Sequence, residues 1–255
     1  MASEKPLVYL LLGAAGSGRR EILVDLVQAG LAETDTAAVM LAGSETPSEC
    51  DASFARLSRW EWRDEMIVGE VPADASHVFF VTDGRTNPVE QIEVFKTWVE
   101  AQGGELARVL CVVSCQLVEK NPPLLAWYEA CVHFSDVVLL TRREGVANKW
   151  LSGFLGHFEK QFYPCLFELV KGGRVKNPAL VLDPLARRMS HVFDADQEWV
   201  FTDAEGKEID EDEETEGDEE VEAKLEEDIY FARDAAGRRA KRIPDIAKFL
   251  VQPTG

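Results

Sequence analysis

The sequence lacks features that would place it in a membrane, in an oxidising compartment or on nucleic acid. Its apolar runs fall well short of the roughly 20 residues that a membrane-spanning helix needs. Its five cysteines are an odd number without a C-x-x-C pair, which is typical of reduced thiols and predicts a cytoplasmic protein. The formal net charge of −19 argues against binding to a nucleic-acid backbone. We therefore expect no membrane and no nucleic-acid partner.

The N-terminus leaves one alternative open. Lys5, the apolar residues 7–12 and the small residues 13–15 have the order of a short secretory signal peptide. The same apolar run fits a buried strand, and this is the interpretation that we favour.

Groups for nucleophilic catalysis or metal binding are also scarce. The sequence has no G-x-S-x-G motif, and its four histidines lack the spacing of a metal pair. We expect these histidines in the core or on the surface. Cys111 and Cys115, four residues apart on a predicted central strand, are expected to be inert core residues.

Negative charge is concentrated in one segment. Residues 203–228 hold 16 acids and 2 bases, and account for −14 of the net charge. Within this acidic loop, residues 210–220 are too charged to fold alone, so we expect them to loop out into solvent, and the loop could contact a protein partner. β-Hairpin-like turns are predicted on either side of it, in residues 199–207 and 229–238. A basic strip follows, which we expect to be solvated rather than docked on the acidic loop: Arg238, Arg239, Lys241 and Arg242.

Residues 1–192 alternate short apolar runs with amphipathic stretches, the pattern of β-α units around a parallel sheet. Strands are expected at 7–12, 78–81, 109–113, 137–140 and 165–169, with 38–41 as a further candidate. Helices are expected at 20–29, 88–101, 123–132 and 148–162, and also at 54–62, where an amphipathic helix would pack its aromatic residues on the sheet. We predict an α/β, doubly wound, mostly parallel sheet in residues 1–192 and an acidic β-hairpin-like appendage in residues 193–255.

The first predicted strand leads directly into a glycine-rich loop and a helix. In the P-loop motif G-x-x-x-x-G-K-[ST], backbone N–H groups surround phosphates, the lysine reaches the terminal phosphates and the hydroxyl ligates magnesium. The loop positions are present here as Gly13, Gly16, Ser17 and Gly18. Arg19 replaces the lysine, and Arg20 replaces the hydroxyl residue, which removes a ligand and adds a charge where Mg²⁺ would lie. A similar turn also occurs in doubly wound proteins for packing alone, without a nucleotide.

Taken with later segments, the loop resembles the CobW-type metal-trafficking GTPases, a P-loop family with HypB-like and UreG-like members. The resemblance spans about residues 7–190. Residues 78–92 follow the family's layout of a strand, T-x-G and D-P, with Gly84 and Pro88 matching. Residues 108–114 look like its V-V-D segment, and residues 134–144 are similar to its guanine-reading segment F-A-D-V-I-L-L-N-K-x-D. Residues 171–182 are similar to the segment that closes its nucleotide-binding domain.

The resemblance implies a GTP-binding domain. The positions that it assigns to nucleotide binding are Gly13, Gly16, Ser17, Gly18, Arg19, Arg20, Asp83, Gly84, Thr141, Arg142 and Glu144. Several of these depart from the family: Thr141, Arg142 and Glu144 stand for Asn, Lys and Asp. Val81 replaces the acid at the strand end, and Cys50 stands alone where the family has a C-x-C-C metal motif.

Phosphoryl transfer requires a bound metal and an oriented water. These substitutions leave no obvious residue to bind the metal or to orient the water. We therefore expect impaired or lost hydrolysis: a weak GTPase at most, and rather a pseudoenzyme. Two functions stay open. One is a CobW-like GTP-binding protein in metal trafficking, in which Arg19 and Arg20 could hold a phosphate without magnesium. The other is a pseudo-GTPase without nucleotide, serving as an interaction scaffold through its acidic appendage.

Overall fold

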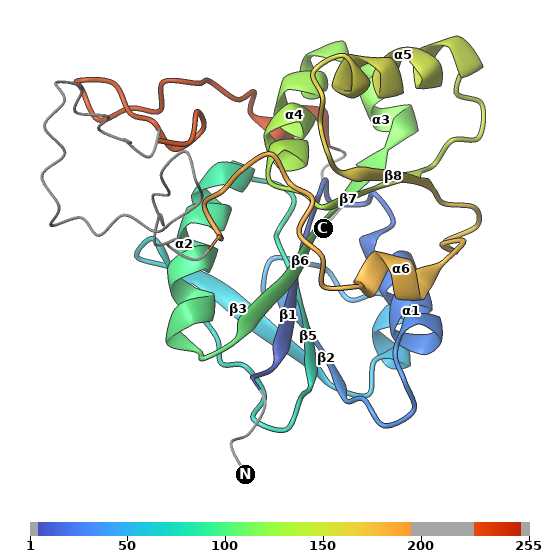
Figure 1. Ribbon diagram of the computed structural model, residues 1–255, viewed down its shortest axis with the longest axis vertical. Helices are drawn as coiled ribbons and strands as arrows, with labels where there is room; N and C mark the ends of the chain where they lie inside the picture. Colours follow the sequence, from blue (N-terminus) through green and yellow to red (C-terminus); the bar gives the residue numbers. More distant parts are fainter. Residues whose placement is uncertain (1–4, 195–226, 251–255) are drawn as a thin grey trace, which may run out of the picture.

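The computed structural model describes residues 5–194 and 227–250 (Figure 1). Its strands are β1 (Leu7–Gly13), β2 (Ala37–Ala42), β3 (Leu57–Arg63), β4 (Met66–Val68), β5 (His77–Val81), β6 (Glu105–Ser114), β7 (Val137–Thr141) and β8 (Leu166–Leu169). Its α-helices are α1 (Arg19–Gly30), α2 (Pro88–Ala101), α3 (Cys115–Lys120), α4 (Leu125–His133), α5 (Asn148–Glu159) and α6 (Pro178–Leu182). Short 3₁₀ turns are η1 (Glu49–Ser53), η2 (Pro122–Leu124) and η3 (Ile246–Phe249).

The described strands form one sheet in the order β4-β3-β2-β5-β1-β6-β7-β8. Every neighbouring pair is parallel except β3 and β4, which form an antiparallel hairpin at one edge. The six predicted strands are confirmed, and they read as continuous apolar runs because helices cover both faces of the sheet. With a glycine-rich loop between β1 and α1, this is the predicted α/β, doubly wound fold of P-loop NTPase type.

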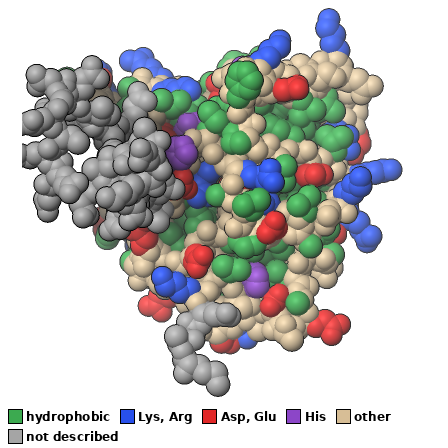
Figure 2. Space-filling view, in the orientation of Figure 1, with side chains coloured by type: hydrophobic (Ala, Val, Ile, Leu, Met, Phe, Trp, Pro, Cys, Tyr) green, Lys and Arg blue, Asp and Glu red, His purple; other side chains and the backbone are tan. Residues whose placement is uncertain are grey.

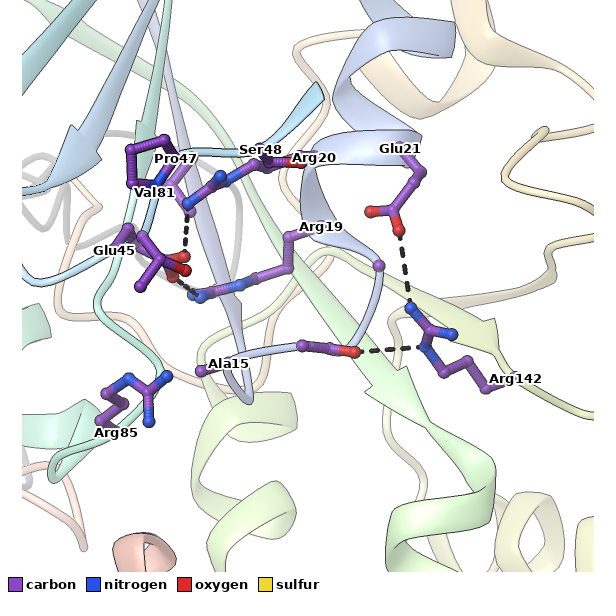
Figure 3. A pocket seen from close by; sticks show the side chains of 13 residues that line it. Ala15, Arg19, Arg20, Glu21, Glu45, Pro47, Ser48, Val81, Arg85 and Arg142 are labelled. Atoms are coloured by element: carbon purple, nitrogen blue, oxygen red, sulfur yellow. Dashed lines mark hydrogen bonds and ion pairs between the residues drawn. The ribbon is translucent and has the colours of Figure 1, made fainter. Parts of the chain in front are cut away.

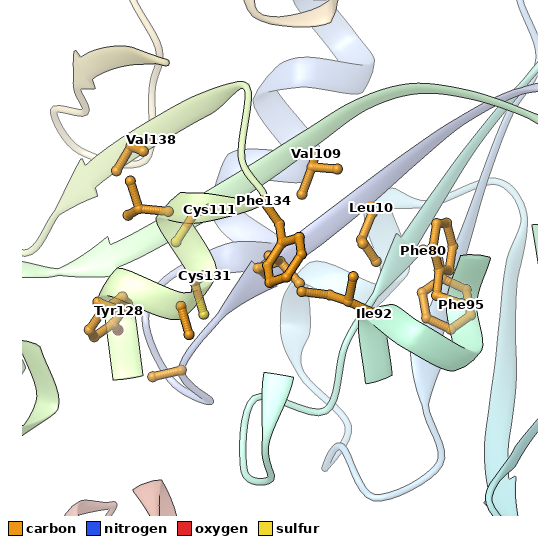
Figure 4. Close-up of a cluster of buried hydrophobic side chains, with 14 of the residues drawn as sticks. Leu10, Phe80, Ile92, Phe95, Val109, Cys111, Tyr128, Cys131, Phe134 and Val138 are labelled. Carbon is orange, nitrogen blue, oxygen red and sulfur yellow. The ribbon is translucent and has the colours of Figure 1, made fainter. Parts of the chain in front are cut away.

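Two hydrophobic cores lie on opposite faces of the sheet because side chains alternate along a strand. In β1, Val8, Leu10 and Leu12 face one core, while Tyr9 and Leu11 face the other. Helices α2, α4 and α5 pack on the first face, part of which is drawn in Figure 4, and α1 and α6 pack on the second. Because these strands are parallel, the loop that connects a strand to the following helix lies at the edge of the sheet where the strands end.

The helix predicted for residues 54–62 is wrong. Residues 57–63 form strand β3, which pairs in parallel with β2. Trp60 is buried in the first core, and its indole Nε1 donates a hydrogen bond of 2.9 Å to the carbonyl oxygen of Val81. The two tryptophans, Trp60 and Trp62, are two residues apart, which is the period of a strand. Cys115 likewise begins helix α3 and does not lie on the central strand with Cys111.

The remaining helix predictions are confirmed with small shifts. Helix α2 begins at Pro88, and the side chain of Asn87 caps it by accepting from the amide of Val89. The helix expected at 123–132 is divided between η2 and α4, and α5 ends at Glu159, three residues before its expected end.

The described C-terminal segment, residues 227–250, packs on the first core. Tyr230 and Ile246 are buried there. Asp228, at the end of the acidic loop predicted for residues 203–228, is half-buried, with 7% of its side chain exposed; Ser190 donates to its carboxylate at 2.6 Å, and His133 Nε2 lies 2.8 Å from it. The domain boundary near residue 192 stays a prediction, and residues 203–226 of the acidic loop lie outside the described residues.

The turns and the basic strip were predicted in part. The turn in residues 229–238 is present at Asp234–Gly237, but it is closed by a single bridge between Arg233 and Arg239 and not by two strands. Arg239 is not solvated as expected, because it pairs with Glu93 of α2. The turn expected in residues 199–207 lies outside the described residues.

The surface of the described part carries mixed charge. On the face seen in Figure 2, acidic and basic side chains are interspersed. The acidity of the sequence is therefore not a property of this face. No helix among the described residues is long and apolar enough to cross a membrane.

Candidate functional site

The glycine-rich loop, residues 13–18, lies where β1 ends and α1 begins. Gly13 has φ +128°, and a Cβ there would lie 2.4 Å from the carbonyl oxygen of Val112 in β6. Only glycine permits this approach, so the loop can start close to the neighbouring strand. Gly18 takes φ +94° and directs the chain into α1, which begins at Arg19. The amides of Gly16 and Gly18 have no acceptor among the described residues, which leaves donors at this helix N-terminus.

A pocket of about 340 Å³ lies beside this loop; we call it the phosphate pocket (Figure 3). Its walls come from the glycine-rich loop, the first turn of α1, residues 45–48 after β2, the end of β5 and the loop after β7. Four arginines line it, with two glutamates: Arg19, Arg20, Arg85, Arg142, Glu21 and Glu45. An anion is the ligand that such a lining favours.

Arg19, at the position of the P-loop lysine, is turned into the protein. Its side chain is 4% exposed and forms an ion pair with Glu45. It also donates hydrogen bonds to the carbonyl oxygens of Thr82, at 2.6 Å, and Asp83, at 3.3 Å. Burial lowers the pKa of Arg19, and the nearby carboxylates of Glu45 and Asp83 counter part of that shift.

Arg20, at the position of the magnesium-binding hydroxyl, shares the same glutamate. Its guanidinium lies 2.7 Å from one oxygen of Glu45 and 3.1 Å from Asp51. Each oxygen of the Glu45 carboxylate therefore contacts a different arginine. Figure 3 shows Glu45 reaching both from the loop after β2. We call Arg19, Arg20, Glu45 and Asp51 the arginine–glutamate cluster.

Magnesium does not fit this cluster. The hydroxyl ligand of the P-loop is replaced by a buried guanidinium, and both nearby carboxylates are already paired with arginines. Mg²⁺ would also lie beside two positive side chains. In residues 5–194 and 227–250, no group of three or more His, Cys, Asp or Glu side chains could hold a metal ion.

Asp83 and Gly84 serve the loop structure. The carboxylate of Asp83 accepts from the amides of Arg85 and Thr86 and from the side chain of Gln91, so it closes its own turn. The carbonyl oxygen of Gly84 accepts from the amide of Ala15 at 2.9 Å. One amide of the glycine-rich loop is therefore already occupied by the protein.

The residues expected to read guanine have separate roles. Thr141 is buried, and its hydroxyl lies 2.7 Å from the carbonyl oxygen of Ser17, to which it donates. Arg142 donates to the carbonyl oxygen of Gly16 at 3.1 Å, and its guanidinium lies 3.5 Å from Glu21. Glu144 is exposed, and its side chain lines neither of the two pockets beside the glycine-rich loop.

The structure thus brings Gly16, Gly18, Arg19, Arg20 and Arg142 together around one pocket. The other predicted site residues do not line this pocket: Gly13, Ser17, Asp83, Gly84, Thr141 and Glu144. Sequence reasoning missed Glu45 and Arg85. Both follow strand ends at the same edge of the sheet. Ligands bind at this edge in open α/β sheets, so their position after a strand is the feature of the sequence that could have indicated them.

No protein-family model and no curated protein sequence matches the chain. Solved structures that resemble it include three proteins at low identity. Zn(II)-bound YjiA GTPase from E. coli is 14% identical, with TM-score 0.40, over 72% of this chain and 67% of that one. Signal recognition particle receptor FtsY from Elizabethkingia anophelis, in complex with GDP, is 15% identical, with TM-score 0.47, over 72% and 65%. Hydrogenase maturation factor HypB from Archaeoglobus fulgidus is 12% identical, with TM-score 0.41, over 65% and 81%. At identities this low, the likeness concerns the fold alone.

Proposed function

We propose that the chain is a P-loop nucleotide-binding protein that holds the phosphates of its ligand with arginines and backbone amides, without Mg²⁺ and without hydrolysing them. The observation that carries this proposal is the position of Glu45. Its carboxylate lies in the phosphate pocket and is held by Arg19 and Arg20 together. The two guanidinium groups therefore already bind an oxyanion, supplied by the protein itself.

A ligand phosphate has the same requirement as the Glu45 carboxylate. Arginine binds phosphate oxygens with paired N–H donors, as it binds carboxylates. The N-terminus of α1 adds backbone donors that favour negative charge. Glu45 is on a loop between β2 and η1, so its side chain can be displaced without moving a strand. A phosphate would then take its place between Arg19 and Arg20.

Loss of hydrolysis follows from the same side chains. Phosphoryl transfer needs a group that offsets the developing charge and another that orients water. The magnesium position is taken by Arg20, and Val81 stands at the end of β5. Asp83 is the nearest acid after that strand, and its carboxylate is held by its own turn.

The resemblance of the sequence to CobW-type GTPases supports GTP as the nucleotide and metal trafficking as the setting. Titration calorimetry with GTP, GDP and ATP, with and without Mg²⁺, tests the proposal. We expect binding that Mg²⁺ does not strengthen, and affinity at least about tenfold higher in Glu45→Gln, because the internal competitor loses its charge. Arg85→Ala should weaken binding, because Arg85 lines the phosphate pocket. Its matched control is Arg238→Ala, on an exposed turn outside the pocket.

Two results would contradict the proposal. One is no binding at millimolar nucleotide to either wild type or Glu45→Gln. The other is binding that requires Mg²⁺ and is followed by phosphate release.

A second function is favoured by the number of groups around the pocket that are already bonded within the protein. Arg19, Arg20 and Arg142 are each bonded to protein groups, and the amide of Ala15 is bonded to Gly84. A site satisfied in this way fits a pseudo-GTPase scaffold that holds no nucleotide. Failure of wild type and of Glu45→Gln to bind any nucleotide would support this second function. The acidic residues 203–228 would then be the first segment to test against a basic protein partner.

A further inference from the structure

We infer that the organic group of the ligand lies in a second pocket and not beside Glu144. This inference rests on the proposed function. The second pocket has a volume of about 270 Å³ and shares Ala15, Gly16 and Arg85 with the phosphate pocket. A ligand can therefore place its phosphate in one pocket and the group attached to it in the other.

The walls of the second pocket are apolar on one side. Leu117 comes from α3, and Phe249 and Leu250 come from the C-terminal segment. Ser114, at the end of β6, and Ser17 supply hydroxyl groups. Such a wall, with a few polar groups, suits a small organic body with apolar faces and one or two polar atoms at its edge.

Ser17 has an unmet hydrogen bond. The residue is 1% exposed, and its hydroxyl has no partner among the described residues. A buried hydroxyl without a partner is costly, and such groups are uncommon in folded proteins. Ser17 lines the second pocket but not the phosphate pocket, so a polar atom of a ligand there is the partner available to it.

Arg85 lies where the two pockets meet. It lines both, and within the described residues its guanidinium forms no hydrogen bond and no ion pair. Figure 3 shows this side chain beside Ala15, apart from the Arg19–Glu45 pair. Arg85 is placed to hold the charged end of a ligand whose organic end lies against Leu117 and Phe249.

The neighbourhood of Glu144 offers less. Arg142 extends over the glycine-rich loop to Gly16 and Glu21, and an organic group at this end of the phosphate pocket would have to break those contacts. The second pocket requires no such rearrangement. The ligand class that follows is a phosphate ester whose organic group is small, flat or branched, with apolar faces.

Phenyl phosphate and inorganic phosphate are suitable probes, because they differ only in the organic group. Each is titrated against the whole protein and its Glu45→Gln variant. We expect phenyl phosphate to bind about tenfold more tightly than phosphate, as expected for burial of an apolar ring. Leu117→Ala and Phe249→Ala should remove that advantage while the affinity for inorganic phosphate stays within about twofold.

Two further variants distinguish a change in the second pocket from loss of binding caused by unfolding. Leu117→Trp fills the second pocket from a half-buried helix position, so it should remove the phenyl advantage without leaving a cavity. Leu185→Ala, at an exposed leucine outside both pockets, is the matched control and should keep it.

The outcomes separate this inference from the proposed function. A phenyl advantage that survives all three pocket variants, or one that disappears in Glu144→Ala, overturns the inference alone. Binding of phosphate with no phenyl advantage also overturns it alone. If neither probe binds wild type or Glu45→Gln, the proposed function fails and the inference fails with it.

Discussion

The carbonyl oxygen of Gly84 accepts a hydrogen bond of 2.9 Å from the amide of Ala15. This contact joins the turn after β5 to the glycine-rich loop after β1. It also brings Gly84 so close that a Cβ there would lie 2.5 Å from the carbonyl oxygen of Gly13 and 2.6 Å from the amide nitrogen of Ala15. The two loops therefore position one another through backbone atoms, and the side chain of Arg19 adds hydrogen bonds from α1 to the carbonyl oxygens of Thr82 and Asp83.

Gly84→Ala should destabilise the protein by roughly 3 kcal/mol or more, because the new methyl meets backbone atoms and the residue has φ +66°. Gly145→Ala is the control, since it has φ +79° with open space around the Cβ and should cost only about 1–2 kcal/mol. Urea denaturation measures both free energies of unfolding. Equal losses would show that the close approach is not rigid.

Thr141→Val should destabilise the protein by about 1–3 kcal/mol, because it leaves the buried carbonyl oxygen of Ser17 without its donor. The valine has nearly the same shape, so the loss reports on the hydroxyl. Thr141→Ser restores the donor and should recover most of the stability. If valine and serine behave alike in chemical denaturation, the hydrogen bond contributes little.

Glu45→Gln should lower the free energy of unfolding by roughly 3 kcal/mol in chloride buffer, since two buried guanidiniums lose their shared carboxylate. Added phosphate should raise the melting temperature of this variant more than that of wild type at equal ionic strength, because it binds the folded state. The same response in both proteins would contradict the idea that phosphate replaces Glu45.

Acid should weaken the attachment of the C-terminal segment. Burial raises the pKa of Asp228, but hydrogen bonds from His133, Ser190 and the amide of Tyr230 outweigh it and hold the pKa below its ordinary value. A carboxyl whose pKa is lower in the folded state stabilises the protein above its unfolded pKa of about 3.9, and this contribution is lost as the pH falls through the folded pKa.

The matching variant is Asp228→Asn. It should be about 1–3 kcal/mol less stable than wild type at pH 7, and the difference should shrink below about pH 4. Denaturation curves at pH 7, 5 and 3 measure it. A difference that is the same at all three values would rule out the carboxylate as its source.

Much of the fold could be predicted from residues alone, because strands covered on both faces consist of continuous apolar runs. The run before Gly13 and the Asn87–Pro88 helix start are examples. The strand containing Trp60 was missed because the arginines interleaved with its aromatic residues suggested an amphipathic helix: Arg56, Arg59 and Arg63. Its pairing with β2 is a long-range contact that no local pattern contains.

The position of the site was predictable, but the ion pairs within it were not. Glycine spacing located the loop, and the substitutions at residues 19 and 20 were visible at once. The partner of both arginines was not, because Glu45 lies in a loop of no regular pattern and reaches them only when β1 and β2 end at the same edge of the sheet. Asp228 was missed for a similar reason: an acidic run gave no sign that the carboxylate of its last residue would be held by His133 and Ser190.

The arginine–glutamate cluster also makes its members depend on one another. Replacing Arg19 by lysine would remove the fork that now holds Glu45 together with the carbonyl oxygens of Thr82 and Asp83. Replacing Arg20 by a hydroxyl residue would leave Asp51 without one of its guanidinium partners and Glu45 with only one. Each replacement is costly while Glu45 stays, and losing Glu45 first leaves the buried guanidinium of Arg19 without its ion pair and Arg20 with Asp51 alone. We expect the effects of substitutions at the three positions to be strongly non-additive, so that a conventional P-loop could not be built here by single substitutions.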